Sequence, residues 1–120
     1  MDKEEMKRRT KQFALRVIRL VESLPNGRTA EVIGRQLLRS GTSVGANYRA
    51  ACRAKSTADF ISKMGTVEEE ADESSYWMEL LVEAEIVKAD RLESLMKEAD
   101  ELLAITVASV NTAKKRSRKE

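Results

Sequence analysis

A seam of apolar and small residues recurs at steps of three and four along the middle of the chain. It consists of Phe60, Met64, Val67, Ala71, Ser74, Met78 and Leu81. Because an α-helix has about 3.6 residues per turn, this spacing places all of these side chains on one face of a long helix. A seam of this kind suits the near-parallel packing of helices in a bundle.

Three further segments carry apolar residues with the same helical period. They run roughly over residues 4–24, from 29 to about 54, and from 90 onward. The Pro25-Asn26-Gly27 turn ends the first of them. The expected N-caps of the later helices are Thr29, then Ser56 or Thr57, then Asp90. Because short connections make neighbouring helices antiparallel, residues 1–113 are predicted to form an all-α, up-and-down antiparallel four-helix bundle.

The chain has 120 residues, which is enough for one domain with a single core. Residues 114–120 contain no apolar side chain and are predicted to be a disordered basic tail. One cysteine, Cys52, fits a reducing compartment. The N-terminus lacks the apolar core of a secretory signal, so the expected location is cytoplasmic. No apolar run approaches the roughly 20 residues of a membrane span, so no membrane association is expected.

Two stretches, residues 76–82 and 102–110, are more apolar than one buried stripe requires. Another copy of the protein is the expected cover, so a homo-oligomer is predicted. The small residues between Arg39 and Tyr48 would let a second backbone approach closely. The predicted close-packing or interface residues are Ser40, Gly41, Ser43, Gly45, Asn47, Tyr76 and Trp77.

The chain contains no histidine. This argues against a di-iron bundle site, which uses Glu-x-x-His pairs, and against Ser-His or Cys-His nucleophiles. The acidic run 68–73 is interpreted as a solvated face or as the partner of arginines on a neighbouring helix, rather than as a metal site. No metal, no cofactor and no enzymatic activity are therefore expected.

The charge is unevenly distributed: residues 1–60 have 13 Lys and Arg against 6 Asp and Glu, whereas residues 61–120 have 9 against 14. On a helical wheel Arg35, Arg39, Arg49 and Arg53 form one stripe opposite the apolar face. The predicted nucleic-acid-binding residues are these four arginines and Lys114, Lys115, Arg116, Arg118 and Lys119. Ion pairing of the stripe with the acidic third helix is an equally open interpretation. Aromatic residues do not interleave with the basic ones, so contacts to backbone and shape are expected rather than stacking.

Three segments together resemble the family of 23S rRNA-intervening sequence proteins: RSGTSVGANYR at 39–49, AKSTADFISK at 54–63 and EEADESSYWMELL at 69–81. The resemblance covers roughly residues 10–105. It implies a bacterial four-helix bundle that assembles into a homopentamer. Ala50 departs from the family, which often has Glu after Tyr-Arg, and this puts any role of that carboxylate in doubt.

Two functions follow as hypotheses. The first is a non-enzymatic oligomer that binds structured RNA or DNA through the basic face. The second is a protein-interaction scaffold whose arginines pair with Glu69, Glu70 and Glu73 of its own or a neighbouring chain. A related fold serves as the accessory protein of retroelement reverse transcriptases, so a reverse transcriptase is a further partner that the resemblance suggests.

Overall fold

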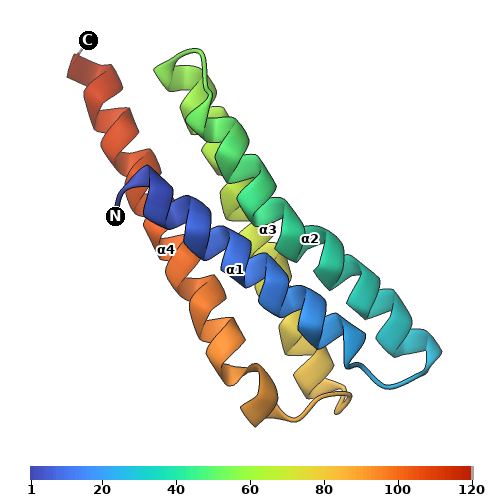
Figure 1. The fold of residues 1–120 in the computed structure, drawn as a ribbon. Coiled ribbons are helices and arrows are strands. Elements are labelled where there is room, and N and C mark those ends of the chain that lie inside the picture. The colour runs from blue at the N-terminus through green and yellow to red at the C-terminus, as the bar shows by residue number, and fades with distance from the viewer. Residues whose placement is uncertain (120) are drawn as a thin grey trace.

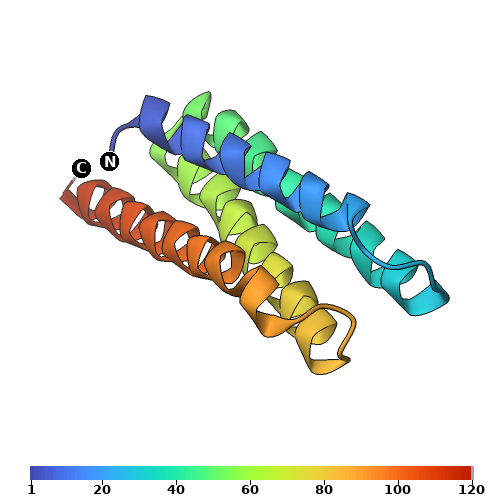
Figure 2. The same ribbon diagram turned by 60° about the horizontal axis from the view of Figure 1, so that its bottom comes forward.

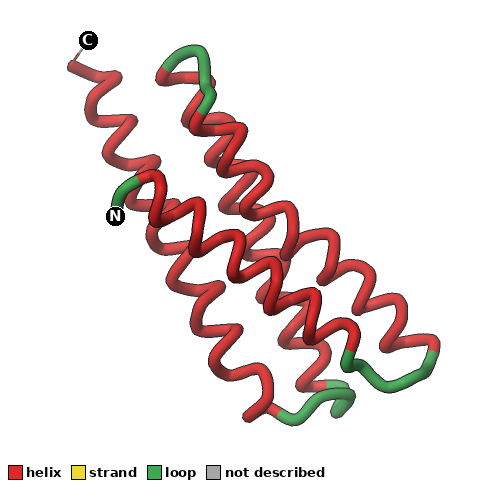
Figure 3. Tube along the Cα trace, in the orientation of Figure 1, coloured by secondary structure: helices red, strands yellow, loops and turns green. Residues whose placement is uncertain are grey.

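The computed structural model describes residues 1–119, and every regular element in that range is a helix. The helices are α1 (Lys3–Glu22), α2 (Arg28–Cys52), α3 (Thr57–Glu83) and α4 (Ala89–Lys119). Short turns join them, so each helix runs antiparallel to the one before it (Figures 1 and 3). The predicted all-α fold with four helices is confirmed. None of the helices in the described part is long and apolar enough to cross a membrane.

Side-chain caps begin two of the helices. Asp2 accepts a hydrogen bond from the backbone N–H of Glu5 at 2.8 Å, and Ser56 accepts one from that of Asp59 at 3.0 Å. Each cap satisfies an N–H group that the first helical turn leaves without a partner. The predicted cap at Ser56 is therefore confirmed.

The other two predicted caps were wrong. Helix α2 begins after Gly27 rather than Thr29, and Gly27 adopts φ +150° without any side-chain cap. A residue with a side chain rarely adopts that backbone conformation, so the glycine fixes the start of the helix. Helix α4 begins at Ala89, which places Asp90 in the first turn, where its carboxylate complements the positive end of the helix dipole.

The turn between α3 and α4 contains no glycine, yet it needs a left-handed residue. Glu85 takes this role with φ +60°. The backbone N–H groups of Ile86 and Val87 then donate to the carbonyl of Leu81 at 3.0 and 3.1 Å, which closes the end of α3. The chain thus ends α3 by backbone hydrogen bonding, without the Gly or Pro signal by which such turns are usually recognised.

The bundle is elongated, with extents of 53 × 21 × 20 Å. Consecutive helices pack closely along their lengths, and among the helix pairs that touch, α1 and α4 have the thinnest contact (Figure 2). Where α1 and α4 do meet, the contacts include polar ones: Arg9 pairs with Glu98, and Arg16 donates to Ser94 at 2.8 Å. The core lies between the helices and includes the fully buried Phe13, Leu37, Met64, Met78, Leu81, Leu92 and Leu102.

The predicted disordered tail needs correction. Residues 114–119 continue α4 as an exposed helix, and residue 120 lies outside the described residues. Lys and Arg are good helix formers, and cations in the last turn complement the negative end of the helix dipole. Helix propagation from Ala113, which is buried, therefore needs no tertiary contact beyond it.

Candidate nucleic-acid interface

The small residues of α2 pack against helices of the same chain. A Cβ added to Gly41 would lie 2.8 Å from the side chain of Val17 on α1, and one on Gly45 would lie 3.1 Å from Thr10. On the α3 side, the Ser74 hydroxyl donates to the buried Ser40 hydroxyl at 3.0 Å. The predicted close approach thus brings α2 against α1 and α3 within the chain.

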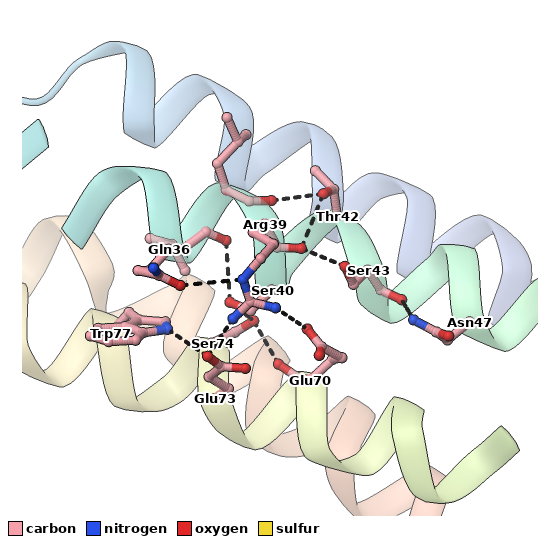
Figure 4. A network of polar contacts seen from close by, with 12 residues as sticks. Gln36, Arg39, Ser40, Thr42, Ser43, Asn47, Glu70, Glu73, Ser74 and Trp77 are labelled. Carbon is pink, nitrogen blue, oxygen red and sulfur yellow. Dashed lines mark hydrogen bonds and ion pairs between the residues drawn. The ribbon is translucent and has the colours of Figure 1, made fainter. Parts of the chain in front are cut away.

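Ser43 and Asn47 do not reach a second helix through hydrogen bonds of their own. The Ser43 hydroxyl donates to the Arg39 carbonyl at 2.6 Å, and the Asn47 amide donates to the Ser43 carbonyl at 2.8 Å. Both bonds stay within α2 (Figure 4). They bind backbone carbonyls one turn earlier on the same helix.

Arg39 lies at the centre of a polar network between α2 and α3 (Figure 4). Its guanidinium donates to Glu70 at 3.3 Å, to Glu73 at a shorter distance, and to Gln36 on its own helix at 3.2 Å. The indole N–H of Trp77 also donates to Glu73, at 3.3 Å. Arg39 is therefore occupied by carboxylates of the same chain, as the ion-pair interpretation of the stripe predicts for it.

The two carboxylates beside Arg39 differ in their protonation behaviour. Hydrogen bonding from Arg39 holds the pKa of Glu73 below its ordinary value, and the bond from Trp77 acts in the same direction. Burial raises the pKa of Glu70, and this desolvation outweighs the attraction of Arg39. The guanidinium in turn has its pKa raised, mainly by the bond to Glu73. Glu73 is thus the stronger partner of the arginine.

The remaining arginines of the predicted stripe fall into two groups. Arg35 pairs with Glu31 at 3.0 Å, one turn earlier on α2, and both side chains are largely exposed. Arg49 and Arg53 are exposed, and within residues 1–119 neither makes an ion pair or a side-chain hydrogen bond. Arg49 lies in the last turn of α2, and Arg53 directly follows that helix.

Arg49 and Arg53 lie at the same end of the bundle as the predicted basic tail. Helices α2 and α4 run in the same direction, so their C-termini lie at one end, together with the N-termini of α1 and α3 (Figure 1). We call residues 1–8, 46–63 and 112–119 the basic end. It carries twelve Lys and Arg against four Asp and Glu, a net charge of +8, whereas the rest of the described chain carries ten against fifteen, a net charge of −5.

A groove opens at the basic end, beyond the point where α1 begins. It has a volume of about 740 Å³, and residues from all four helices line it, among them Tyr48, Phe60 and Ile105. Three cations, Lys3, Lys55 and Arg116, also belong to its lining. These residues are far apart in the sequence, so the pairing of aromatic with basic side chains was missed. In the sequence, the place of Phe60 in an apolar helical seam predicted only that its side chain packs against other helices.

Apolar surface remains on the outside of the bundle. Tyr76 is 52% exposed, and its ring packs edge-on against Trp77 with the ring centres 5.1 Å apart. In the apolar run 102–110, Leu102 and Thr106 are buried in the chain's own core, whereas Val107 is 37% exposed. The bundle therefore covers part of each apolar stretch by itself, and the role of Tyr76 and Trp77 between copies stays a prediction.

No catalytic constellation comes together in the described residues. Within residues 1–119 no three Cys, Asp or Glu side chains are placed so that they could hold a metal ion. Cys52 is half-buried near the end of α2. The fold and the charge distribution thus place the protein in the class of small all-helical bundles with a strongly charged end.

The chain belongs to the 23S rRNA-intervening sequence protein family, whose profile matches residues 2–108. A solved structure that is similar to it is a protein with unknown function from the S23 ribosomal protein family of Bacteroides thetaiotaomicron VPI-5482. The two chains are 36% identical with a TM-score of 0.86, and the match covers 92% of this chain and 99% of the other. No curated protein matches the chain. The resemblance predicted from the three sequence segments is confirmed.

Proposed function

We propose that this protein is a non-enzymatic, self-associating binder of structured RNA or DNA, and that its basic end contacts the phosphate backbone. The observation that carries this proposal is the position of Arg49 and Arg53. Both are exposed and unpaired within residues 1–119, and both lie at the same end as the cations of residues 114–119. Arginine's fork of donors suits phosphate oxygens, and unpaired guanidiniums need not break an ion pair in order to bind.

Charge at the basic end supports the same proposal. A net charge of +8 at one end of a chain with a net charge of +2 concentrates the positive potential there. The acidic residues gather elsewhere, where Glu70 and Glu73 hold Arg39. Self-association of several copies would multiply this potential. Binding through phosphates would then be strong at low salt and weakly dependent on sequence.

The test is a gel-shift series with an RNA hairpin and a DNA duplex at several salt concentrations. Wild-type affinity is expected to fall by orders of magnitude between about 50 and 200 mM salt. The double variant R49Q/R53Q should bind more weakly, with a slope of log affinity against log salt that is smaller by about 2. R35Q is the matched control, because Arg35 already pairs with Glu31, and it should behave almost like the wild type. Absence of any shift at 50 mM salt would overturn the proposal.

One observation favours the scaffold as a second candidate. Arg39 is bound by Glu70 and Glu73 within the chain, which is part of what the scaffold hypothesis predicts. That hypothesis requires R39Q/R49Q to lose the oligomer and not a nucleic-acid complex. Mass measurement of this double variant separates the two functions: an intact oligomer that has lost nucleic-acid binding would reject the scaffold. A reverse transcriptase partner stays a prediction from the family resemblance.

A further inference from the structure

We propose that the groove at the basic end holds one unpaired nucleotide of the bound RNA or DNA. This inference rests on the proposed function and adds a base site to its backbone contacts. The groove exists because the helices differ in length. Helix α1 has 20 residues and α4 has 31, so α4 continues beside the α2–α3 turn where α1 is no longer present to fill the space (Figure 1).

The groove has the size and lining of a site for a flat ring. Its volume of about 740 Å³ lies within the usual range of small-ligand pockets. The wall of the groove is aromatic and aliphatic and includes Tyr48, Phe60 and Ile105. On the α4 side the lining has only small side chains at two positions, Ala108 and Ala113, which leave room for a ligand. Phe60 is the partly exposed aromatic residue of this wall, and aromatic side chains bind bases of any sequence by stacking, since every base has a π-face.

A tyrosine hydroxyl in the lining can donate a hydrogen bond to a ligand in the groove. Tyr48 lines the groove and is only 7% exposed. Cys52, one turn later on α2, also lines the groove, and its thiol is a weak hydrogen-bonding partner. Burial and this neighbour raise the pKa of Tyr48 well above its ordinary value, so the hydroxyl stays protonated and remains a donor at neutral pH. Base edges carry carbonyl and ring-nitrogen acceptors that such a donor can meet.

The cations in the groove lining favour a negatively charged group next to the flat ring of the ligand. Lys3, Lys55 and Arg116 reach the groove from three different parts of the chain. The first turn of α3, through Ser56 and Thr57, adds the positive end of a helix dipole to the same lining. The carboxylates of Asp2 and Glu4 act on Tyr48 from the α1 side, but the basic end as a whole keeps its net charge of +8. The apolar wall and the cations together fit a ligand that joins a flat ring to a phosphate, and a nucleotide is such a ligand.

The position of the groove favours a nucleotide within a strand. Arg49, Arg53 and Lys114 belong to the same end and would hold the phosphates on either side of it. A base inside a duplex is stacked and paired, so it must leave the stack to enter the groove. That step costs least at a bulge, a mismatch or a strand end. The groove therefore predicts a preference for structured nucleic acid that contains one unpaired nucleotide.

The experiment compares two fluorescent RNA hairpins that differ only by a single bulged nucleotide, with affinities measured by anisotropy. The wild type should bind the bulged hairpin about tenfold more tightly. A108W fills the groove and should bind both hairpins with the affinity of the wild type for the paired one. A104W is the matched control, because Ala104 is an exposed residue of α4 outside the groove lining, and it should keep the preference. Y48F should lose part of the preference.

The outcomes separate this inference from the proposed function. Equal wild-type affinity for both hairpins, or a preference that survives in A108W, would overturn the nucleotide site and leave backbone binding in place. Absence of binding to either hairpin at low salt would overturn both proposals. Circular dichroism establishes that A108W is folded. If A108W is unfolded, a titration of the wild type with uridine monophosphate, followed by NMR, replaces the comparison with that variant. Chemical-shift changes at Tyr48, Phe60 and Ser109 would support the nucleotide site, and their absence would count against it.

Discussion

At the scale of single residues, glycine acts in opposite ways at two positions of this bundle. Gly41 lies where α2 touches α1, and an added Cβ would come within 2.8 Å of both methyl groups of Val17. Gly65 lies inside α3, and an added Cβ would meet nothing within 4 Å. The same substitution therefore tests packing at one position and helix propensity at the other.

Gly41→Ala is expected to destabilise the protein by about 1 kcal/mol. Overpacking costs about 1–3 kcal/mol, which exceeds the roughly 1 kcal/mol that Ala gains over Gly within a helix. Gly65→Ala should raise the stability by up to about 1 kcal/mol, because only the propensity changes. Urea denaturation at one fixed protein concentration measures both. Equal effects at the two positions would contradict the close contact of α2 with α1.

At the scale of the helices, Arg39 joins α2 to two carboxylates of α3 whose pKa values move in opposite directions. Arg39 lowers the pKa of Glu73, so this pair contributes stability above the ordinary carboxyl pKa and loses it as the pH falls through the lowered value. Burial raises the pKa of Glu70, so the ionised form of Glu70 lowers the stability of the fold at neutral pH. Protonation of Glu70 at lower pH removes this cost.

Glu73→Gln should lower the stability by about 0.5 kcal/mol at pH 7, the size typical of partly exposed ion pairs. The difference from the wild type should shrink as the pH falls from 7 through the lowered pKa of Glu73, because this carboxyl is then protonated in the wild type as well. Glu70→Gln, the matched variant on the same helix, should cause no loss at pH 7. Thermal unfolding followed across this pH range measures both variants. A larger loss in Glu70→Gln than in Glu73→Gln would reverse the assignment of the stronger partner.

The sequence predicted those features of the helices that depend on local pattern. The seam from Phe60 to Leu81 and the cap at Ser56 are such features, because periodicity and a side-chain cap are both visible in a single chain. The turn at Glu85 was not predictable in this way, since its left-handed backbone is imposed by hydrogen bonds to Leu81. A helical wheel placed Arg39 beside Arg49, but it could not show that only Arg39 faces glutamates of α3.

The candidate site was predicted only in part for a related reason. The basic residues of the α2 stripe and of residues 114–119 were identified by composition, whereas their meeting at one end follows from the parallel direction of α2 and α4. The groove depends on the difference in length between α1 and α4, and residues 114–119 were expected to be disordered. Local propensity alone decides such a terminal extension, because no packing partner marks it.

At the scale of the whole molecule, exposed apolar surface is what the predicted oligomer would cover. Tyr76 is the largest such side chain on α3, and it lies next to Trp77. Tyr76→Glu should lower the mass measured by sedimentation at micromolar concentration, because a buried carboxylate without a partner is costly. Val32→Glu is the control, because Val32 on α2 is exposed to a similar extent, at 53%, and lies outside the predicted interface. A monomeric wild type would contradict the prediction.

The thin contact between α1 and α4 also bears on how the chain folds. Contacts between these two helices are the ones that join the beginning of the sequence to its end, and they are few. Nearly all other packing forms between neighbours joined by a short turn, so little loop entropy is lost before contacts begin to stabilise the structure. Helical proteins with such local topology fold in microseconds to milliseconds. The hairpin of α2 and α3, which have the most extensive contact, is where that process would begin.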